Sequence, residues 1–226
     1  LISVRGLSKN FGPVPALASV DLELGGGQIV GLLGQNGCGK TTLLKVLAGV
    51  MQDYEGQVRI AGNELGPDTK ACVSYLDDSA TVAQCITMFS DFFQDFQADK
   101  ANDMIAFFGL VADMKLKQMS KGMREKAQIA LAMSRDAKVF LLDEPISGVD
   151  PAARDGLLEG IVRNLEADAL VLISTHLIHD LETVLDAVVM MRHGKVLLTG
   201  QVDDLRAEHG LSIDALFRKV YSWSAC

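Results

Sequence analysis

Residues 34–41 have the types and the spacing of a phosphate-binding loop. Their sequence, Gly-Gln-Asn-Gly-Cys-Gly-Lys-Thr, fits the pattern G-x-x-x-x-G-K-[ST] and lies between the apolar run Gln28–Leu33 and the helix-like run Thr41–Ala48. Glycines let backbone N–H groups turn inward around phosphate oxygens, at a helix N-terminus whose dipole favours negative charge. The alternative is a tight turn that matches the pattern by chance, and the flanking strand and helix patterns disfavour it.

Two side chains of this loop would add to its backbone. Lys40 is expected to hold the β- and γ-phosphates of a nucleotide, and Thr41 is expected to ligate Mg²⁺ through its hydroxyl. Hydrogen bonds to charged groups stabilise by ~1.5–3 kcal/mol each, so several together outweigh a net negative charge on the chain. The predicted phosphate-binding positions are Gly34, Asn36, Gly37, Cys38, Gly39, Lys40 and Thr41.

Two adjacent carboxylates follow a second apolar run. Asp143 and Glu144 come directly after Val139–Leu142. Ligands of open α/β sheets bind beyond the carboxyl ends of strands, so we expect Asp143 to reach Mg²⁺ and Glu144 to polarise a water for attack on the γ-phosphate. Without other motifs, two carboxylates at a strand end are more often a solvated end of the strand than a site. The phosphate loop elsewhere in the chain makes the functional interpretation the favoured one.

The composition is that of a folded, mildly acidic chain. It has 226 residues, 21 Lys and Arg against 29 Asp and Glu, a formal charge of −8, and 49% hydrophobic residues. The longest charge-free stretches, such as Gly25–Gly39, are short and interrupted by glycine, whereas a membrane span needs roughly 18 apolar residues. The start does not resemble a signal peptide, so we expect a cytosolic protein. The acidic total argues against wide coverage of nucleic acid, which needs a basic face.

The cysteines and two histidines do not predict a disulfide framework or a zinc site. No C-x-x-C spacing occurs, and four cysteines are too few for a disulfide framework in a chain of this length. His176 and His179 invite a metal interpretation, which we reject because no third or fourth ligand has suitable spacing. The cysteines expected to be reduced thiols are Cys38, Cys72, Cys85 and Cys226.

Short apolar runs alternate with helix-length amphipathic stretches, which predicts an α/β fold. Val139–Leu142 and Leu170–Ser174 are nearly continuous apolar runs, typical of buried parallel strands, and a helix from Pro151 to about Leu165, capped by Asp150, would join them. The final ~25 residues look helical. The first few of the early strands look like an antiparallel edge sheet, and those strands are Ile2–Leu7, Ala18–Leu24, Gln28–Leu33, Gly56–Ala61 and Ala71–Leu76.

The segment from Thr81 to Gln118 has no strand-like run and holds six of the nine phenylalanines. We interpret it as a helical insert. Four of them have the spacing i, i+3, i+4 and i+7 of one helix face, which would pack onto a helix at Met104–Leu110 or, alternatively, dock a partner in part. These four are Phe89, Phe92, Phe93 and Phe96.

Almost the whole chain resembles an ATP-binding cassette (ABC) ATPase, with further motifs in the order of that family. Residues 119–123, Met-Ser-Lys-Gly-Met, stand where that family has its Leu-Ser-Gly-Gly-Gln signature, and Ser147–Asp150 resembles its D-loop. His176 ends a strand as the switch histidine does, and Phe11 matches the aromatic residue that stacks on adenine. The resemblance implies a P-loop NTPase fold in one domain, 1–226. That fold has a mostly parallel core sheet, an antiparallel edge β-subdomain and a helical subdomain at about 79–135.

The resemblance also implies roles for residues outside the loop. Ser120 and the backbone at Gly122 would contact the γ-phosphate held by a second subunit, so that two ATP molecules lie between two cassettes. His176 would contact the γ-phosphate, and Asp150 would couple the two sites. Thr42 would support the α-phosphate.

Two departures from the family pattern bear on turnover and on transport class. Where the family has a glutamine that contacts Mg²⁺, this chain has Asp77 and Asp78; Asp78 aligns better as a metal ligand, and its charge predicts slower turnover. Lys121 replaces a signature glycine and is either a phosphate contact across the dimer or a solvated lysine. The Ser-Lys-Gly-Met form and the short insert resemble cassettes of bacterial ABC-2 type exporters.

The leading hypothesis is therefore a Mg²⁺-dependent ATPase that drives a separate integral-membrane permease. It would work as a homodimer or related heterodimer on the inner face of the cell membrane, without binding nucleic acid. An ATP-gated interaction module with little hydrolysis and a soluble, non-transport ABC ATPase are the alternatives. A small-molecule kinase would leave residues 119–123 and 174–176 unexplained.

Overall fold

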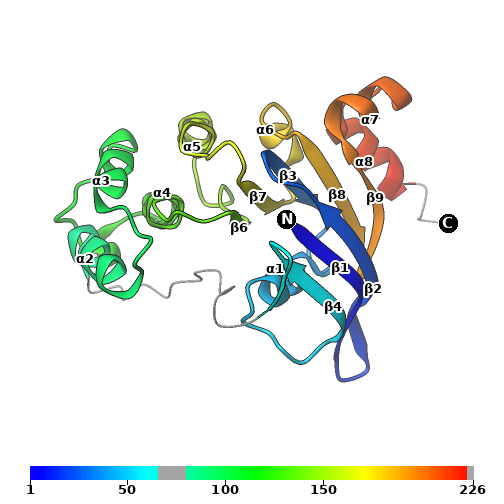
Figure 1. Cartoon of the computed structure of the whole chain (residues 1–226). Coiled ribbons are helices and arrows are strands. Elements are labelled where there is room, and N and C mark those ends of the chain that lie inside the picture. Colours follow the sequence, from blue (N-terminus) through cyan, green and yellow to red (C-terminus); the bar gives the residue numbers. More distant parts are fainter. Residues whose placement is uncertain (66–79, 223–226) are drawn as a thin grey trace.

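Two β-sheets organise the chain (Figure 1). The computed structural model describes residues 1–65 and 80–222. Within them, an antiparallel sheet has the strand order β2-β1-β4-β5, and a five-stranded sheet has the order β6-β7-β3-β8-β9. The strands are β1 (Ile2–Phe11), β2 (Val14–Leu24), β3 (Gln28–Leu33), β4 (Glu55–Ile60), β5 (Asn63–Glu64), β6 (Val139–Asp143), β7 (Leu170–Thr175), β8 (Ala187–Arg192) and β9 (Lys195–Gln201).

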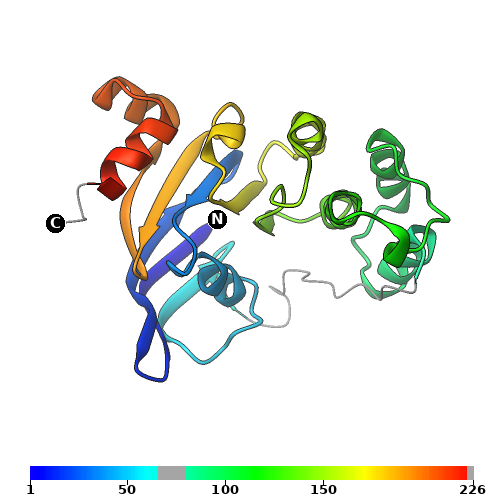
Figure 2. The ribbon, with the colours of Figure 1, turned by 180° about the vertical axis from the view of Figure 1, so that it is seen from behind.

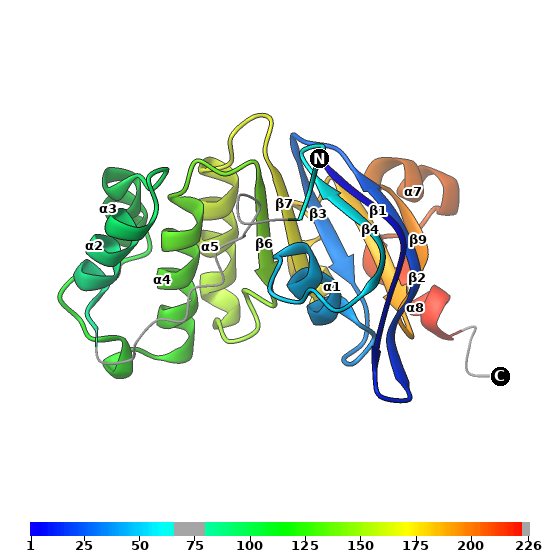
Figure 3. The ribbon, with the colours of Figure 1, turned by 60° about the horizontal axis from the view of Figure 1, so that its bottom comes forward.

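Helices lie on both faces of the five-stranded sheet and extend beyond its β6 edge (Figure 3). A single turn of 3-10 helix, η2 (Leu116–Gln118), precedes α4. The α-helices are α1 (Lys40–Leu47), α2 (Val82–Phe92), α3 (Ala98–Phe107), α4 (Lys121–Met133), α5 (Pro151–Arg163), α6 (Ile178–Leu181), α7 (Val202–His209) and α8 (Ile213–Ser222).

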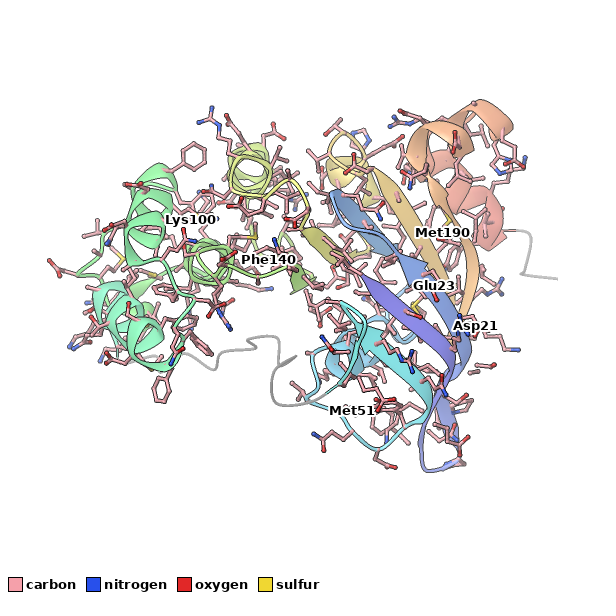
Figure 4. All side chains as sticks on the ribbon, in the orientation of Figure 1. Asp21, Glu23, Met51, Lys100, Phe140 and Met190 are labelled. Atoms are coloured by element: carbon pink, nitrogen blue, oxygen red, sulfur yellow. The ribbon has the colours of Figure 1, made fainter. Side chains whose placement is uncertain are left out.

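The central strand β7 is buried on both faces, as its continuous apolar sequence predicts. Val171 and Ile173 pack into the core shared with α2 to α8, whereas Leu170 and Leu172 pack into the core shared with α1 and the antiparallel sheet. Phe140 and Met190, labelled in Figure 4, belong to the first of these cores. The prediction of a parallel strand buried on both faces is therefore confirmed for β7, whereas β6 is parallel but lies at the sheet edge, with Val139 and Leu141 only half-buried.

Helix α1 lies between the two sheets (Figure 3). Its side chains Leu43 and Leu47 are fully buried there, and burying a leucine stabilises by roughly 1.5–3 kcal/mol. This packing fixes the first turn of α1, and with it the loop that enters the helix from β3.

Parallel pairing brings three strand ends to one edge of the sheet. β7 lies between β3 and β6, and Leu33 of β3 pairs with Thr175, whereas Asp143 of β6 pairs with Ser174. The loop after β3, the carboxylates after β6 and the histidine after β7 therefore meet at the same edge.

The predicted phenylalanine helix is wrong in its length. α2 ends at Phe92, which is 75% exposed, and Phe93 already has an extended backbone. The chain turns back so that the rings of Phe93 and Phe96 lie 5.5 and 5.4 Å from that of Phe89. Arg135 explains the turn, because it pairs with Asp95 and stacks 4.1 Å from the Phe93 ring.

Most of the other predicted elements are confirmed to within a few residues. The early strands do form an antiparallel sheet, except that Gln28–Leu33 belongs to the five-stranded one. The predicted strand Ala71–Leu76 lies outside the described residues, and β8 and β9 were not predicted. No helix in the described part of the chain is long and apolar enough to cross a membrane.

The predicted C-terminal helices are α7 and α8, which pack beside β9 and α6 (Figures 1 and 2). The buried Glu182, just after α6, joins them. Its carboxylate accepts hydrogen bonds from Arg206 of α7 and from the backbone N–H of Ile213 at the start of α8. Burial opposes ionisation, but these hydrogen bonds prevail and hold the pKa of Glu182 below its ordinary value.

Candidate active site

The loop between β3 and α1 has a backbone that its glycines make possible. Gly37 and Gly39 have φ of 79° and 110°, in the left-handed region that side chains disfavour. A Cβ on Gly39 would also lie 2.5 Å from the carbonyl oxygen of Ala16 in β2. Gly39 is the residue before α1, so the first N–H groups of that helix face the loop.

Lys40 is folded back over the loop. The residue is only 5% exposed, and its Nζ donates hydrogen bonds to the carbonyl oxygens of Gly34, at 2.7 Å, and Gln35, at 3.4 Å. The same Nζ lies 3.5 Å from Oε1 of Glu144. A buried ammonium therefore lies between the loop and the acidic strand end, and its predicted contact with the β- and γ-phosphates stays a prediction.

Thr41 and Asp143 meet across the site. Oγ1 of Thr41 donates a hydrogen bond to Oδ1 of Asp143 at 3.2 Å. Two neighbouring ligands of an octahedral Mg²⁺ with bonds of 2.0–2.1 Å lie about 2.9 Å apart, and hydroxyl and carboxylate oxygens are the atoms that Mg²⁺ prefers. The pair therefore fits the predicted metal site.

Ser174 orders this acidic strand end, and sequence reasoning missed it. The residue is fully buried; its Oγ donates to Oδ1 of Asp143 at 2.5 Å and accepts from the backbone N–H of Glu144 at 3.0 Å. The signal that could have found it is the register of the parallel strands, which places Ser174 opposite Asp143. One hydroxyl therefore aligns both acidic residues.

Glu144 and His176 lie in direct contact. Nδ1 of His176 is 2.8 Å from Oε2 of Glu144, a hydrogen bond that requires the proton on Nδ1 because an ionised carboxylate only accepts. Glu144 has a φ of +50°, which costs ~1–3 kcal/mol in a residue other than glycine and is typical of functional positions. Glu144 and His176, each predicted to be catalytic, thus lie together, with Glu144 beside Lys40.

The signature residues lie at the start of α4. Ser120 is exposed and caps the helix by accepting a hydrogen bond from the N–H of Met123. A Cβ on Gly122 would lie 3.0 Å from the carbonyl oxygen of Gly148, so this helix end packs on the D-loop. Within the described residues, no hydrogen bond or ion pair joins Ser120 or Gly122 to residues 34–42 of the same chain.

The remaining predicted site residues lie around the loop, before α5 or outside the described residues. Phe11 is 52% exposed on the hairpin whose return strand meets the loop at Ala16. Asp150 is the N-cap residue of α5 and Pro151 begins the helix, as predicted, although the Asp150 side chain makes no capping hydrogen bond. Asn36 lies exposed in the loop, and Thr42 is half-buried in α1. Asp78 lies outside the described residues.

Cys38 is a buried thiol of the loop, and Cys85 is a buried thiol of α2. Burial raises the pKa of Cys38, with Lys40 partly opposing that effect. The other two cysteines, Cys72 and Cys226, lie outside the described residues.

The chain is similar to proteins of one family. A family model described as "ABC transporter" matches residues 17–147. YxlF of Bacillus subtilis, an uncharacterized ABC transporter ATP-binding protein, is 30% identical over 96% of this chain and 76% of its own length. The ribose import ATP-binding protein RbsA of Cereibacter sphaeroides is 33% identical over 85% of this chain and 42% of its own length.

Solved structures have the same fold. An ATP-binding subunit of an ABC transporter superposes with a TM-score of 0.86 and 27% identity, over 98% of this chain and 99% of the other. The dimeric bacterial ABC transporter cassette MJ0796 superposes with a TM-score of 0.78 and 19% identity, over 89% and 98%.

Proposed function

Because the chain belongs to the ABC transporter family, of which it is an ATP-binding subunit, we propose that it hydrolyses ATP in a Mg²⁺-dependent reaction that drives a separate membrane permease. The observation that carries this proposal is the cluster at one edge of the five-stranded sheet. There Glu144 lies in contact with both Lys40 and His176, and the Thr41–Asp143 pair adjoins Glu144.

Each side chain of the cluster has a task in phosphoryl transfer to water. Lys40, already desolvated, stabilises negative charge on the β- and γ-phosphates, and the N–H groups before α1 bind the same phosphates. Thr41 and Asp143 would hold Mg²⁺, which supplies neutralisation of charge on the phosphate oxygens. Glu144 orients the attacking water and accepts its proton, while His176 keeps the Glu144 carboxylate in one orientation.

We also propose that two cassettes close around two ATP molecules. Ser120 is exposed at the N-terminus of α4, and Gly122 of the same helix end packs against the D-loop of its own chain rather than its own phosphate loop, which supports a role for Ser120 at the phosphates of a neighbour. A structural neighbour of the chain is a dimer. The partner is a second copy or a related cassette, and the helical subdomain at about 79–135 would contact the permease.

We place the protein among exporters, on the inner face of the cell membrane and without nucleic acid. The Ser-Lys-Gly-Met form of residues 120–123 supports this assignment. The relative RbsA is named for ribose import, so the direction needs its own test. Reconstitution with the permease that copurifies from membranes, followed by cargo transport across vesicles, tests it: ATP-driven movement toward the cytoplasmic side would contradict an exporter.

Phosphate release tests the proposed hydrolysis. The chain should release phosphate from ATP with Mg²⁺, and Glu144→Gln should cut the rate by ~10²-fold or more while ATP still binds, because only the general base is lost. Lys40→Ala should weaken ATP binding in titration calorimetry. Equal turnover of the wild type and the Glu144→Gln variant would remove Glu144 from its role, and a wild type without turnover would favour an ATP-gated module.

A further inference from the structure

The backbone of the D-loop, Ser147–Asp150, is held from one side by a nearly buried carboxylate. Oε2 of Glu125, on α4, accepts a hydrogen bond from the N–H of Gly148 at 3.0 Å, and the Glu125 side chain is only 13% exposed. Burial raises the pKa of Glu125, and the bond from Gly148 and the neighbouring Lys121 partly oppose that shift.

An arginine holds the next residue, Val149, from the other side. Nε of Arg154, on α5, donates to the carbonyl oxygen of Val149 at 3.0 Å. Nη1 of the same guanidinium donates to Oδ2 of Asp180, on α6, at 2.5 Å. The side chains of Arg154 and Asp180 are 16% and 28% exposed, so the link lies largely beneath the surface.

These contacts connect two functional segments through the D-loop. α4 begins at Ser120 and Gly122, and a Cβ on Gly122 would lie 3.0 Å from Gly148 O. α6 follows His176 by one residue and carries Asp180. Two successive residues of a partly buried turn, Gly148 and Val149, are therefore tied, the first to the helix that bears the signature and the second to the segment that follows the histidine.

We propose that Glu125 and Arg154 are positioning residues that hold the D-loop so that the Ser120–Gly122 end of α4 and His176 move as one unit. The proposal rests on the proposed function, because it assigns these residues to the same hydrolytic site. Neither side chain is expected to contact ATP. Their effect is on alignment, and a misplacement of about 1 Å costs ~10²-fold in rate.

Paired substitutions test this inference. Glu125→Ala removes the acceptor for Gly148 N–H, whereas Glu125→Gln keeps an oxygen of the same reach. Arg154→Ala removes both bonds, whereas Arg154→Lys keeps the charge but lacks two separate donor nitrogens. The matched control is Arg163→Ala, an exposed arginine on the same helix that pairs with Glu159.

The expected result is a split between ATP binding and turnover. Glu125→Ala and Arg154→Ala should keep the ATP affinity and KM within about threefold and lower kcat by ~10–100-fold. Glu125→Gln should recover most of kcat, and Arg154→Lys only part of it. A fall in kcat that only follows the unfolded fraction, measured by urea unfolding, would overturn the proposal, and so would unchanged kcat in both alanine variants.

Hydrogen exchange of the nucleotide-free chain separates this inference from the hydrolysis proposal. Exchange of the Gly148 amide should be about tenfold faster in Glu125→Ala and near wild type in Glu125→Gln. Arg154→Ala should also speed exchange of the Val149 amide, which bonds to Ile146 O. Unchanged exchange would overturn the proposal that Glu125 and Arg154 hold the D-loop, even if the wild type hydrolyses ATP. If the exchange rates are as predicted but the wild type shows no turnover, the proposed function and the hydrolytic role of these residues are overturned. The structural conclusion that Glu125 and Arg154 hold the D-loop would then remain.

Discussion

Replacing Ser174 by alanine removes one hydroxyl that aligns the acidic strand end. Its Oγ donates to Oδ1 of Asp143 at 2.5 Å, and this is the bond that fixes the carboxylate facing Thr41. The backbone of Glu144 is less affected, because its N–H also donates to the carbonyl oxygen of Ser174 at 3.1 Å. The loss should therefore fall mainly on Asp143.

The size of the effect follows from the charge of the acceptor. Hydrogen bonds to charged groups stabilise by ~1.5–3 kcal/mol, and loss of a group that orients a metal ligand typically costs ~10–100-fold in metal affinity. We expect Ser174→Ala to raise the Mg²⁺ concentration for half-maximal phosphate release by ~10-fold or more. The assay is phosphate release at saturating ATP over a Mg²⁺ titration.

Ser134→Ala provides the matched control. Ser134 is also fully buried, but its Oγ donates to the carbonyl oxygen of Ala130 within α4, away from the acidic strand end. This variant should lose some stability in urea unfolding and keep the Mg²⁺ dependence of the wild type. If Ser174→Ala shows the same Mg²⁺ dependence as Ser134→Ala, the reasoning about Asp143 is refuted.

Two further predictions concern titration. The lowered pKa of Glu182 means that its stabilising bonds to α7 and α8 are present above the unfolded value of about 4.3 and are lost as pH falls through the lower folded value. The difference in urea stability between wild type and Glu182→Gln should therefore shrink below about pH 4; a constant difference would contradict this. Burial and a raised pKa should make Cys38 react more slowly with iodoacetamide at pH 8 in the native chain than in urea, as peptide mapping would show, and equal rates would be inconsistent with the buried thiol.

The parts of the site that the sequence predicts are those in which neighbours along the chain act together. The loop from Gly34 to Thr41 and the pair Asp143–Glu144 carry their chemistry in consecutive residues, and strand and helix patterns place them at the sheet edge. Ser174 escaped notice because a serine at a strand end is common. Its role depends on which residue of β6 lies opposite it, and that register is a property of the folded sheet.

The length of the predicted phenylalanine helix was also wrong because a contact of the folded chain decided it. The spacing of Phe89, Phe92, Phe93 and Phe96 fits a helix face, yet the chain leaves the helix after Phe92. The competing interaction is Arg135, distant in sequence, which binds Asp95 and stacks on the ring of Phe93. Helical periodicity is a local signal, and a partly buried ion pair formed in the tertiary fold overrode it here.

Sedimentation of the Glu144→Gln variant tests the shared site most directly. With saturating ATP and Mg²⁺, the mass should rise from that of one chain to that of two, because unhydrolysed ATP keeps the Ser120 end of α4 against the loop of the neighbour. With ADP it should remain that of one chain, and Ser120→Glu should block the rise by placing negative charge against phosphate. A Glu144→Gln chain that binds ATP and stays monomeric at every protein concentration would contradict the account.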